Sequence, residues 1–96
     1  MIQSFRDQGT ADLFRERNTR PARRIPRELW RTAQRKLKLL DVAARLEDLL
    51  TPAGNRLELL KGDQAGRHRI RINDQYRLTF RWENGHAYEV YIEDYH

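Results

Sequence analysis

The groups best suited to chemistry lie at the end of the chain, where Asp94, Tyr95 and His96 follow one another. A carboxylate, a phenol and an imidazole can together accept, orient and deliver protons. The ordinary pKa of an imidazole is about 6.5, which suits His96 to proton transfer at neutral pH. The last residues of a domain are also where chains fray. The pattern alone is therefore compatible with a proton-transfer cluster and with a loose tail.

Arginines alternate with mainly apolar residues in the stretch before this tail. One face of a strand collects every second side chain, so the alternation predicts β-strands with one buried and one charged face. Guanidinium groups bind phosphate oxygens in pairs and stack on nucleobases, so these arginines are candidates for binding a nucleic acid. The arginines on the charged face are Arg67, Arg69, Arg71, Arg77 and Arg81.

Matching the buried faces of neighbouring strands predicts the register of this sheet. A three-residue loop over 73–75 keeps one face of the first hairpin wholly apolar. A three-residue loop over 84–86 does the same for the second hairpin by pairing Trp82 with Tyr88. The apolar face is then continuous over three strands and can receive a helix.

The same register sets arginine opposite arginine, Arg71 with Arg77 and Arg67 with Arg81. Like charges directly opposite each other destabilise a sheet, which favours a face that binds an anion. The alternative is an ordinary solvated face, on which ion pairs to the next strand offset the repulsion at little net gain. The offsetting pairs are Arg81–Glu89 and Arg77–Glu93.

The position of the tail depends on where the last strand ends. Strict alternation from Val90 and Ile92 sends Asp94 and His96 to the buried side of the sheet. We therefore expect the strand to end or bulge near Glu93, so that both groups reach the arginine face.

Apolar residues at spacings of three and four predict a helix over 26–40, with Pro26 in its first turn. A helix layer on one face of an antiparallel sheet makes an α+β two-layer domain. The segment over 41–50 either continues this helix past a kink or forms a helical hairpin with it. The other expected elements are an edge strand over 2–5, a helix over 11–17 with Thr10 as its N-cap, a helical segment over 41–50 capped by Asp41, and a strand over 56–60.

Composition limits the class of protein. The 96 residues suit a single domain, 1–96, with one modest core. The net charge is +5, and 16 of the 19 basic residues are arginine, which favours an anionic partner. The chain has no cysteine and no His, Asp and Glu cluster with metal-ligand spacing, so thiol and metal chemistry are not expected. No apolar run is long enough to span a membrane, and no signal peptide is recognisable. We therefore expect a cytoplasmic protein without a membrane partner.

Four segments of the chain together resemble a known family. The segments are Leu-Lys-Gly-Asp-x-x-Gly at 60–66, Arg-Ile-Asn-Asp-Gln-Tyr-Arg-Leu-Thr-Phe at 71–80, Trp-Glu-Asn-Gly-x-Ala at 82–87 and Asp-Tyr-His at 94–96. With the opening Met-Ile-x-Ser-Phe, the chain resembles the HigB branch of the RelE/ParE toxin superfamily. These toxins belong to bacterial type II toxin–antitoxin pairs.

The resemblance implies a small RelE-like fold, with N-terminal helices packed on one face of a twisted, mainly antiparallel sheet. It implies a ribosome-dependent endoribonuclease that cuts mRNA through attack of a 2′-hydroxyl, with no metal or cofactor, and so inhibits translation. The implied partners are a helix-turn-helix antitoxin similar to HigA, and the ribosome with its mRNA. Operator DNA would be reached only through the antitoxin.

The resemblance also implies roles for individual residues. Lys61 and Arg77 match positions that stabilise the charge of the reacting phosphate. Asp94, Tyr95 and His96 match the terminal catalytic cluster of the family. His96 transfers a proton, Tyr95 positions a base or a phosphate, and Asp94 either acts as the base or orients His96.

This chain departs from some relatives at one position. Those relatives carry a catalytic histidine three residues before the loop lysine, where this chain has Glu58. Glu58 as a base and His68 as a partial replacement are alternatives, although alternation places His68 on the apolar side as a structural residue.

Two functions without catalysis are also open. The chain is then a basic module that binds RNA or the ribosome, or an inactive toxin that regulates its own operon together with the antitoxin. The binding module needs the arginine face but not Tyr95 and His96.

Overall fold

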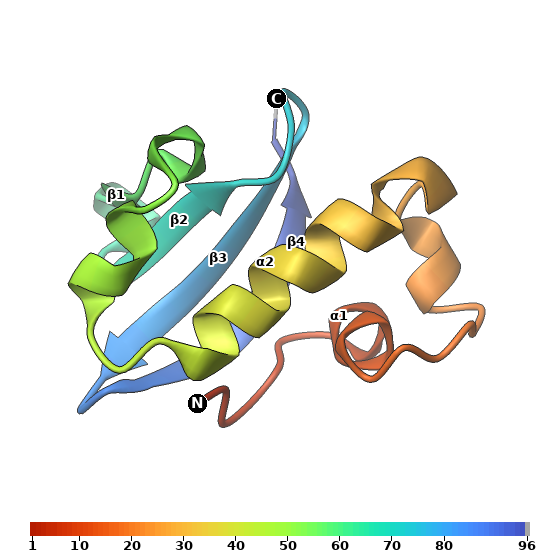
Figure 1. Ribbon diagram of the computed structural model, residues 1–96, viewed down its shortest axis with the longest axis horizontal. Helices are drawn as coiled ribbons and strands as arrows, with labels where there is room; N and C mark the ends of the chain where they lie inside the picture. Colours follow the sequence, from red (N-terminus) through yellow and green to blue (C-terminus); the bar gives the residue numbers. More distant parts are fainter. Residues whose placement is uncertain (96) are drawn as a thin grey trace.

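The second half of the chain forms a four-stranded antiparallel sheet with helices on one of its faces (Figure 1). The computed structural model describes residues 1–95. The predicted α+β two-layer fold is confirmed. The strands are β1 (Glu58–Leu59), β2 (Arg67–Arg71), β3 (Tyr76–Glu83) and β4 (His86–Asp94), in the order β1-β2-β3-β4.

β1 is shorter than the predicted strand over 56–60. Arg56 has a left-handed backbone, with φ of 48°, so extended structure begins only after it. The amide of Leu60 still donates to the carbonyl of Arg67 at 2.9 Å, which closes the edge of the sheet beyond the last residue of β1.

The β2–β3 connection is the predicted three-residue loop over 73–75. It is closed by the amide of Ile72, which donates to the carbonyl of Tyr76 at 3.0 Å. Inside the loop, the side-chain oxygen of Asn73 accepts from the amides of Gln75 (3.0 Å) and Tyr76 (2.6 Å), as Asn commonly does in turns. The resulting register is the predicted one, with Ile70 facing Leu78, Arg71 facing Arg77 and Arg67 facing Arg81.

The β3–β4 connection is a two-residue turn, and the predicted three-residue loop was wrong. Asn84 (φ 52°) and Gly85 (φ 81°) both have left-handed backbone. A turn with two such residues matches the twist of an antiparallel ribbon, and Asn-Gly is the pair that adopts it most readily. Trp82 consequently pairs with Ala87 and not, as predicted, with Tyr88.

A β-bulge returns β4 to the predicted register farther along the hairpin. Glu89 has φ of 51°, and the pairing shifts by one residue between Thr79 and Arg81. Leu78 faces Ile92 as predicted. Before the bulge, the register of the two-residue turn leaves Tyr88 opposite Arg81, so Tyr88 lies on the charged face rather than the apolar one.

The N-terminal segment lies beside β4 and leads into a short helix. The predicted edge strand over 2–5 is reduced to two parallel bridges, Ile2 to Ala87 and Phe5 to Val90. α1 (Gln8–Phe14) begins earlier than predicted, because the carboxylate of Asp7 accepts from the amide of Thr10 at 3.1 Å and caps the helix. Thr10, the predicted cap, is buried instead.

α2 (Trp30–Val42) is the main helix of the second layer and confirms the predicted helix over 26–40. Two 3₁₀ turns precede it, η1 (Ala22–Arg24) and η2 (Arg27–Leu29), and Pro26 stands at the start of η2. None of the helices among the described residues is long and apolar enough to cross a membrane.

The segment over 41–50 does not continue as an α-helix. α2 ends at Val42, and η3 (Leu46–Leu50) and η4 (Ala53–Asn55) follow as 3₁₀ turns. The predicted cap Asp41 accepts instead from the amide of Ile2 at 2.9 Å. The capping carboxylate is that of Asp48, which accepts from the amides of Ala44 and Arg45 at the start of η3.

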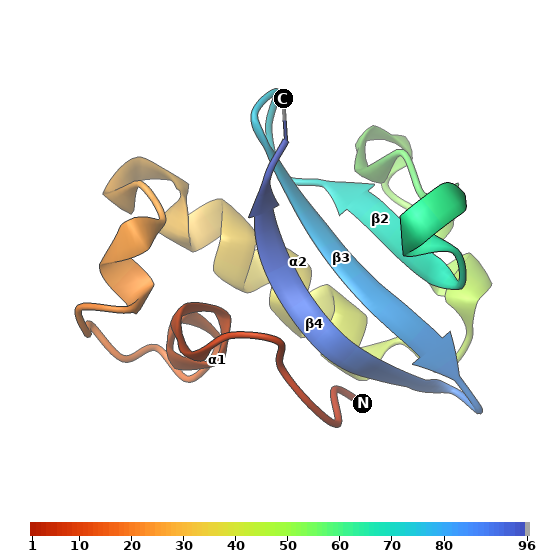
Figure 2. The same cartoon turned by 180° about the vertical axis from the view of Figure 1, so that it is seen from behind.

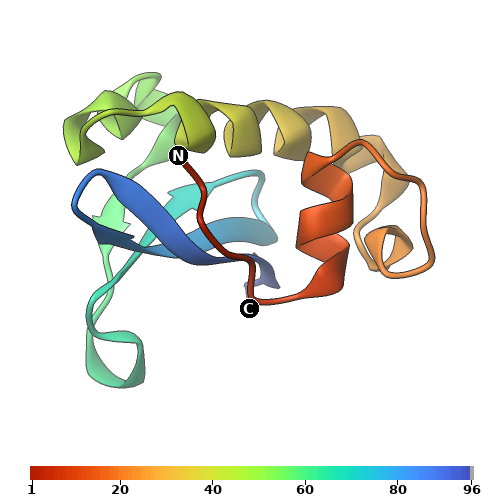
Figure 3. The ribbon, with the colours of Figure 1, turned by 90° about the horizontal axis from the view of Figure 1, so that it is seen from below.

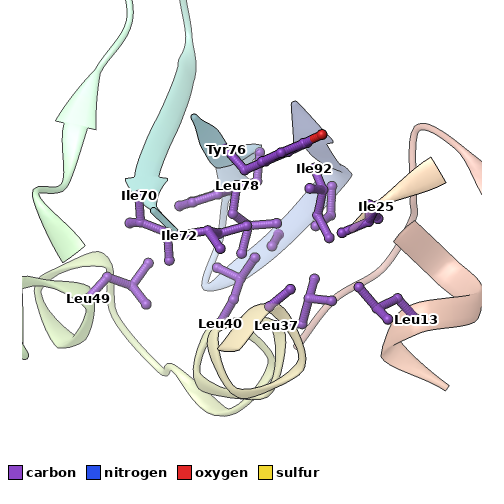
Figure 4. Close-up of a cluster of buried hydrophobic side chains, with 14 of the residues drawn as sticks. Leu13, Ile25, Leu37, Leu40, Leu49, Ile70, Ile72, Tyr76, Leu78 and Ile92 are labelled. Atoms are coloured by element: carbon purple, nitrogen blue, oxygen red, sulfur yellow. The ribbon is translucent and has the colours of Figure 1, made fainter. Parts of the chain in front are cut away.

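The core lies between α2 and the sheet (Figure 4). Fully buried side chains from the helices, the 3₁₀ turns and the sheet meet there, and the largest are Phe80, Leu13, Ile25, Leu37, Leu40, Leu49, Ile70, Leu78 and Ile92. The other face of the sheet has no helix layer over it (Figure 2). The loop with η5 (Gly62–Gln64) projects on that side, opposite to α2 (Figure 3).

Candidate nucleic-acid interface

The uncovered side of the sheet is a charged surface that we call the arginine face. It carries the five predicted arginines, together with three tyrosines from the last strand and the tail. Its members are Arg67, Arg69, Arg71, Arg77, Arg81, Tyr88, Tyr91 and Tyr95. Guanidinium groups lie over all three rings, so aromatic and cationic groups alternate on this face.

Tyr95 is held at one end of the face, which we call the tail end. Its amide donates to the carbonyl of Gln75 at 2.6 Å, which attaches the tail to the β2–β3 loop. The guanidinium carbons of Arg69 and Arg77 lie 4.6 Å and 4.8 Å from the centre of its ring. Arg69 also forms an ion pair with Glu58 at 2.9 Å. The structure therefore brings Glu58, Arg69, Arg77 and Tyr95 together.

Arg77 differs from the other four arginines of the face in its partners. Arg67, Arg69, Arg71 and Arg81 all form ion pairs with carboxylates. Arg77 donates to the backbone carbonyls of the β2–β3 loop and, within residues 1–95, takes part in none of the ion pairs. The predicted pair with Glu93 exists as a strand register but not as a salt bridge. Among the described residues, Arg77 is therefore the arginine of this face that forms no ion pair with a carboxylate.

Asp94 lies at the edge of the tail end rather than on the arginine face. It pairs with Tyr76, and residues paired in this way share a face of the sheet, here the helix side. The amide group of Gln75 donates to its carboxylate at 3.3 Å. β4 ends at Asp94, one residue past Glu93 and close to the expected end, but Asp94 stays on the helix side and does not reach the arginine face as expected. The predicted residue His96 lies outside the described residues.

Carboxylates neutralise the arginines at the other end of the face, which we call the bulge end. Glu89 lies 3.3 Å from Arg81 and 3.8 Å from Arg67, and Arg81 also pairs with Glu83. The bulge turns the carbonyl of Glu89 toward Arg67, which donates to it at 2.8 Å and to the hydroxyl of Thr79 at 3.0 Å. The predicted Arg81–Glu89 pair is confirmed.

Arg67 is the most deeply placed cation of the bulge end, with 11% of its side chain exposed. It lines a cleft of about 370 Å³ with Arg6, Asp63, Gln64 and Glu89. Burial, followed by the charge of Arg6, lowers the pKa of the Arg67 guanidinium, and Glu89 opposes the shift. An arginine stays charged at neutral pH even so, and this cleft therefore presents charges of both signs.

Lys61 lies at the bulge end and not beside Tyr95. It precedes η5, whose flanking glycines Gly62 (φ 67°) and Gly66 (φ 89°) allow the loop to turn away from the sheet. Arg67 starts β2 at this end, and Arg71 ends it beside the tail. At about 3.3 Å per residue, the two ends of β2 are about 13 Å apart. Lys61 and the tail therefore lie at opposite ends of the arginine face.

Two arginines from the N-terminal half extend the face, and the alternation within the strands did not indicate either of them. Arg6 and Arg24 lie over the ring of Tyr91, at 5.3 Å and 5.0 Å. Arg24 also donates to the carbonyl of Ile92 at 2.9 Å and pairs with Asp7 at 2.7 Å. The contacts with Tyr91 and Ile92 join residues more than sixty positions apart, and alternation within a strand carries no information on them.

His68 lies on the apolar side of β2, as alternation predicted. Its ring stacks on Phe80 at 5.8 Å between centres. Burial lowers its pKa, so the neutral imidazole is favoured. Glu58, by contrast, lies on the arginine face through its ion pair with Arg69.

Comparison with known proteins bears on this arrangement. Residues 3–96 match the family described as the RelE-like toxin of type II toxin–antitoxin system HigB. The chain is 37% identical to Toxin HigB-1 of Vibrio cholerae over 93 residues, covering 97% of this chain and 96% of that protein. It is 34% identical to Endoribonuclease HigB of Proteus vulgaris over 98 residues, covering all of both chains.

A solved structure supports the fold independently of close sequence similarity. The YoeB–YefM complex from Staphylococcus aureus contains a chain that superposes with a TM-score of 0.61 at 17% identity, over 100% of this chain and 98% of that one. At this identity the likeness concerns the fold alone, a small α+β domain with helices on an antiparallel sheet. The family match over nearly the whole chain is decisive, and this protein belongs to the HigB-like toxins of type II toxin–antitoxin systems.

Proposed function

We propose that this protein is an endoribonuclease that cuts mRNA on the ribosome and thereby inhibits translation. The observation that carries the proposal is Arg77, which forms no ion pair with a carboxylate within residues 1–95 and which lies over the ring of Tyr95. A preorganised cation of this kind can meet the charge that develops on a phosphate during cleavage. The name of the Proteus vulgaris relative, an endoribonuclease, supports the same reaction class.

The reaction proposed is attack of the 2′-oxygen of the RNA on the adjacent phosphorus. The bond from the 2′-oxygen to phosphorus forms, and the bond from phosphorus to the 5′-oxygen breaks. A base removes the proton of the 2′-hydroxyl, and an acid gives a proton to the departing 5′-oxygen. The products are a 2′,3′-cyclic phosphate and a 5′-hydroxyl, and the balance requires no metal or further reactant.

The proposed roles follow the two ends of the arginine face. Arg77 stabilises the reacting phosphate, and Tyr95 and Arg69 position the groups of the RNA next to that phosphate. Asp94 and His96 carry the proton transfers. Lys61 contacts a phosphate farther along the RNA, because its loop lies at the bulge end. The remaining arginines of the face, Arg67, Arg71 and Arg81, bind the backbone of the same strand.

The proposed cellular setting follows from the family. The antitoxin is a helix-turn-helix protein similar to HigA, and operator DNA is reached only through it. The toxin acts in the cytoplasm, where translating ribosomes present the mRNA. A gene for a small helix-turn-helix protein beside this one would support the pairing.

Mapping of mRNA 5′ ends after induction of the protein in bacteria tests the reaction. New ends inside translated reading frames, absent from a copy of the same transcript without a start codon, are the expected result. Growth arrest without such ends would refute ribosome-dependent cleavage.

Removal of Tyr95 and His96 separates cleavage from binding. A catalyst loses cleavage when the tail is removed, while a module that acts by occupying the ribosome keeps its inhibition, since that function needs only the arginines of the face. Far-UV circular dichroism establishes that the shortened protein is folded. Unchanged inhibition of translation by the shortened protein would favour the binding module.

A further inference from the structure

A second exposed feature lies on α2, on the side of the domain opposite to the arginine face (Figure 3). The last turns of α2 and the loop before η4 enclose a shallow groove of about 520 Å³. Its lining combines three basic residues with three apolar ones. The groove is lined by Arg35, Lys36, Lys38, Leu39, Val42 and Pro52.

The apolar part of the groove is open to solvent. Val42, at the end of α2, is 67% exposed and lines the groove with Leu39 and Pro52. Apolar side chains that gather at an exposed place mark surfaces where another molecule packs. Val42 does not belong to the arginine face, so RNA binding gives no account of it.

The wall of the groove is fixed by a buried polar contact. Lys36 is 8% exposed, and its amine donates to the side-chain oxygen of Asn55, which is fully buried. The side-chain amide of Asn55 donates in turn to the carbonyl of Leu49 at 3.1 Å. This contact ties the η3–η4 segment to α2, so the groove exists before a partner arrives.

The charged groups that line the groove are all basic. Arg35 and Lys38 lie one turn apart on the exposed stripe of α2 that also holds Leu39 and Val42. Within residues 1–95, none of the ion pairs includes Arg35 or Lys38. Arg35 and Lys38 also line a neighbouring cleft, which contains Glu16 and Asp41. A partner in the groove must therefore supply both apolar side chains and carboxylates.

We propose that this groove is the docking site of the cognate antitoxin, through an amphipathic segment that carries apolar and acidic residues. A type II toxin is paired with an antitoxin, and the family is shown by the match over residues 3–96. Apolar side chains of the segment cover Leu39, Val42 and Pro52, and its carboxylates pair with Arg35 and Lys38. The inference needs the family but not the proposed cleavage reaction.

Two substitutions with matched controls test the docking site. Val42→Glu places a carboxylate in the apolar groove, and Leu59→Glu is its control, since Leu59 is 62% exposed on β1. Lys38→Glu reverses a charge of the groove, and Arg20→Glu, outside the groove, is its control. We expect Val42→Glu to weaken binding of the purified cognate antitoxin at least roughly 30-fold. Lys38→Glu should weaken it on the order of tenfold at low salt.

The cellular readout is rescue from growth arrest. The expected result is that Val42→Glu arrests growth and is no longer rescued by co-expressed antitoxin, while Leu59→Glu is rescued like the parent. Antitoxin affinities of both groove variants within threefold of their controls would overturn the proposal. A parent protein that elutes as a dimer, and becomes monomeric with unchanged antitoxin affinity in Val42→Glu, would also overturn it by assigning the groove to a second copy.

The binding measurement keeps this proposal separate from the proposed function. Titration of the antitoxin into folded toxin involves no RNA, so loss of cleavage in a variant does not affect it. Circular dichroism and thermal unfolding show that each variant is folded before it is titrated. If the parent protein cuts no mRNA but Val42→Glu loses the antitoxin, the docking site stands and the endoribonuclease is refuted.

Discussion

The two faces of the sheet consist of alternate residues of the same strands, yet their side chains are kept in place by different interactions. The helix-side face is held by burial, and Ile70, Leu78 and Phe80 on it are fully covered. The arginine face is held by pairs of charged and aromatic groups that stay in contact with water. The free energy gained by burying apolar surface is roughly proportional to the buried area and does not depend on direction. The free energy of an ion pair depends on its geometry. Under the proposed function, the helix-side face determines stability and the arginine face determines activity.

Substitution at the centre of the helix-side face should change stability most. Phe80→Ala removes a fully buried ring that contacts His68 and Trp82. We expect the free energy of unfolding to fall by about 3–5 kcal/mol, because the lost ring leaves a cavity. Urea denaturation followed by circular dichroism measures the change. Arg81→Ala, the next residue and on the other face, is the control and should cost about 0.5 kcal/mol or less.

Equal losses of unfolding free energy in these two variants would contradict the assignment of stability to the helix-side face. The arginine face would then contribute to stability through its ion pairs, against the small value of exposed pairs in general.

Substitution at the tail end of the arginine face should change activity and leave stability nearly intact. Arg77→Ala removes the arginine that forms no ion pair with a carboxylate within residues 1–95, so we expect mRNA cleavage to slow by about 10²–10³-fold. Arg81→Ala should slow it about tenfold at most, since Glu83 and Glu89 already offset that charge. Single-turnover cleavage of mRNA on purified ribosome complexes gives both rates. Equal slowing in the two variants would remove the distinction between the tail end and the bulge end.

The two hairpins show which parts of this architecture could be predicted from sequence. The loop over 73–75 was predicted because only one loop length keeps the apolar residues of both strands on one face. The same reasoning failed at Asn84 and Gly85, where the preference of Asn-Gly for a two-residue turn outweighed the match of apolar residues. The bulge at Glu89 then restored the predicted register, and the lasting effect was that Ala87 and Tyr88 exchanged faces.

The candidate site was predictable where it depends on alternation and not where it depends on distant contacts. The five arginines follow from alternation within β2 and β3, and the structure places all five on one face. Arg6 and Arg24 reach Tyr91 through the path of the N-terminal segment along β4, which no local pattern encodes. The separation of Lys61 from Tyr95 likewise follows from strand direction, since β2 places its two ends at opposite sides of the face.

The helix-side face contains one group that titrates near neutral pH, and it gives a smaller effect. Within the described part of the chain, Nδ1 of His68 is buried without a hydrogen-bond partner, and the ring stacks on Phe80. Burial lowers the pKa of His68 in the folded protein below the ordinary value of 6.5. The unfolded chain therefore binds a proton more readily than the folded protein between the two pKa values.

The sign of the effect follows from this difference. The contribution of His68 to stability is fully present above about pH 6.5 and is lost as the pH falls through the lowered pKa. We expect the free energy of unfolding of the parent to decline from pH 7.5 to pH 4.5 more steeply than that of His68→Phe. The variant keeps a ring against Phe80 but cannot be protonated, so carboxylates and the other histidines contribute equally to both curves. Urea denaturation at several pH values measures the two slopes. Parallel curves would mean that water reaches His68 in the folded protein and that the helix-side face is not fully buried at β2.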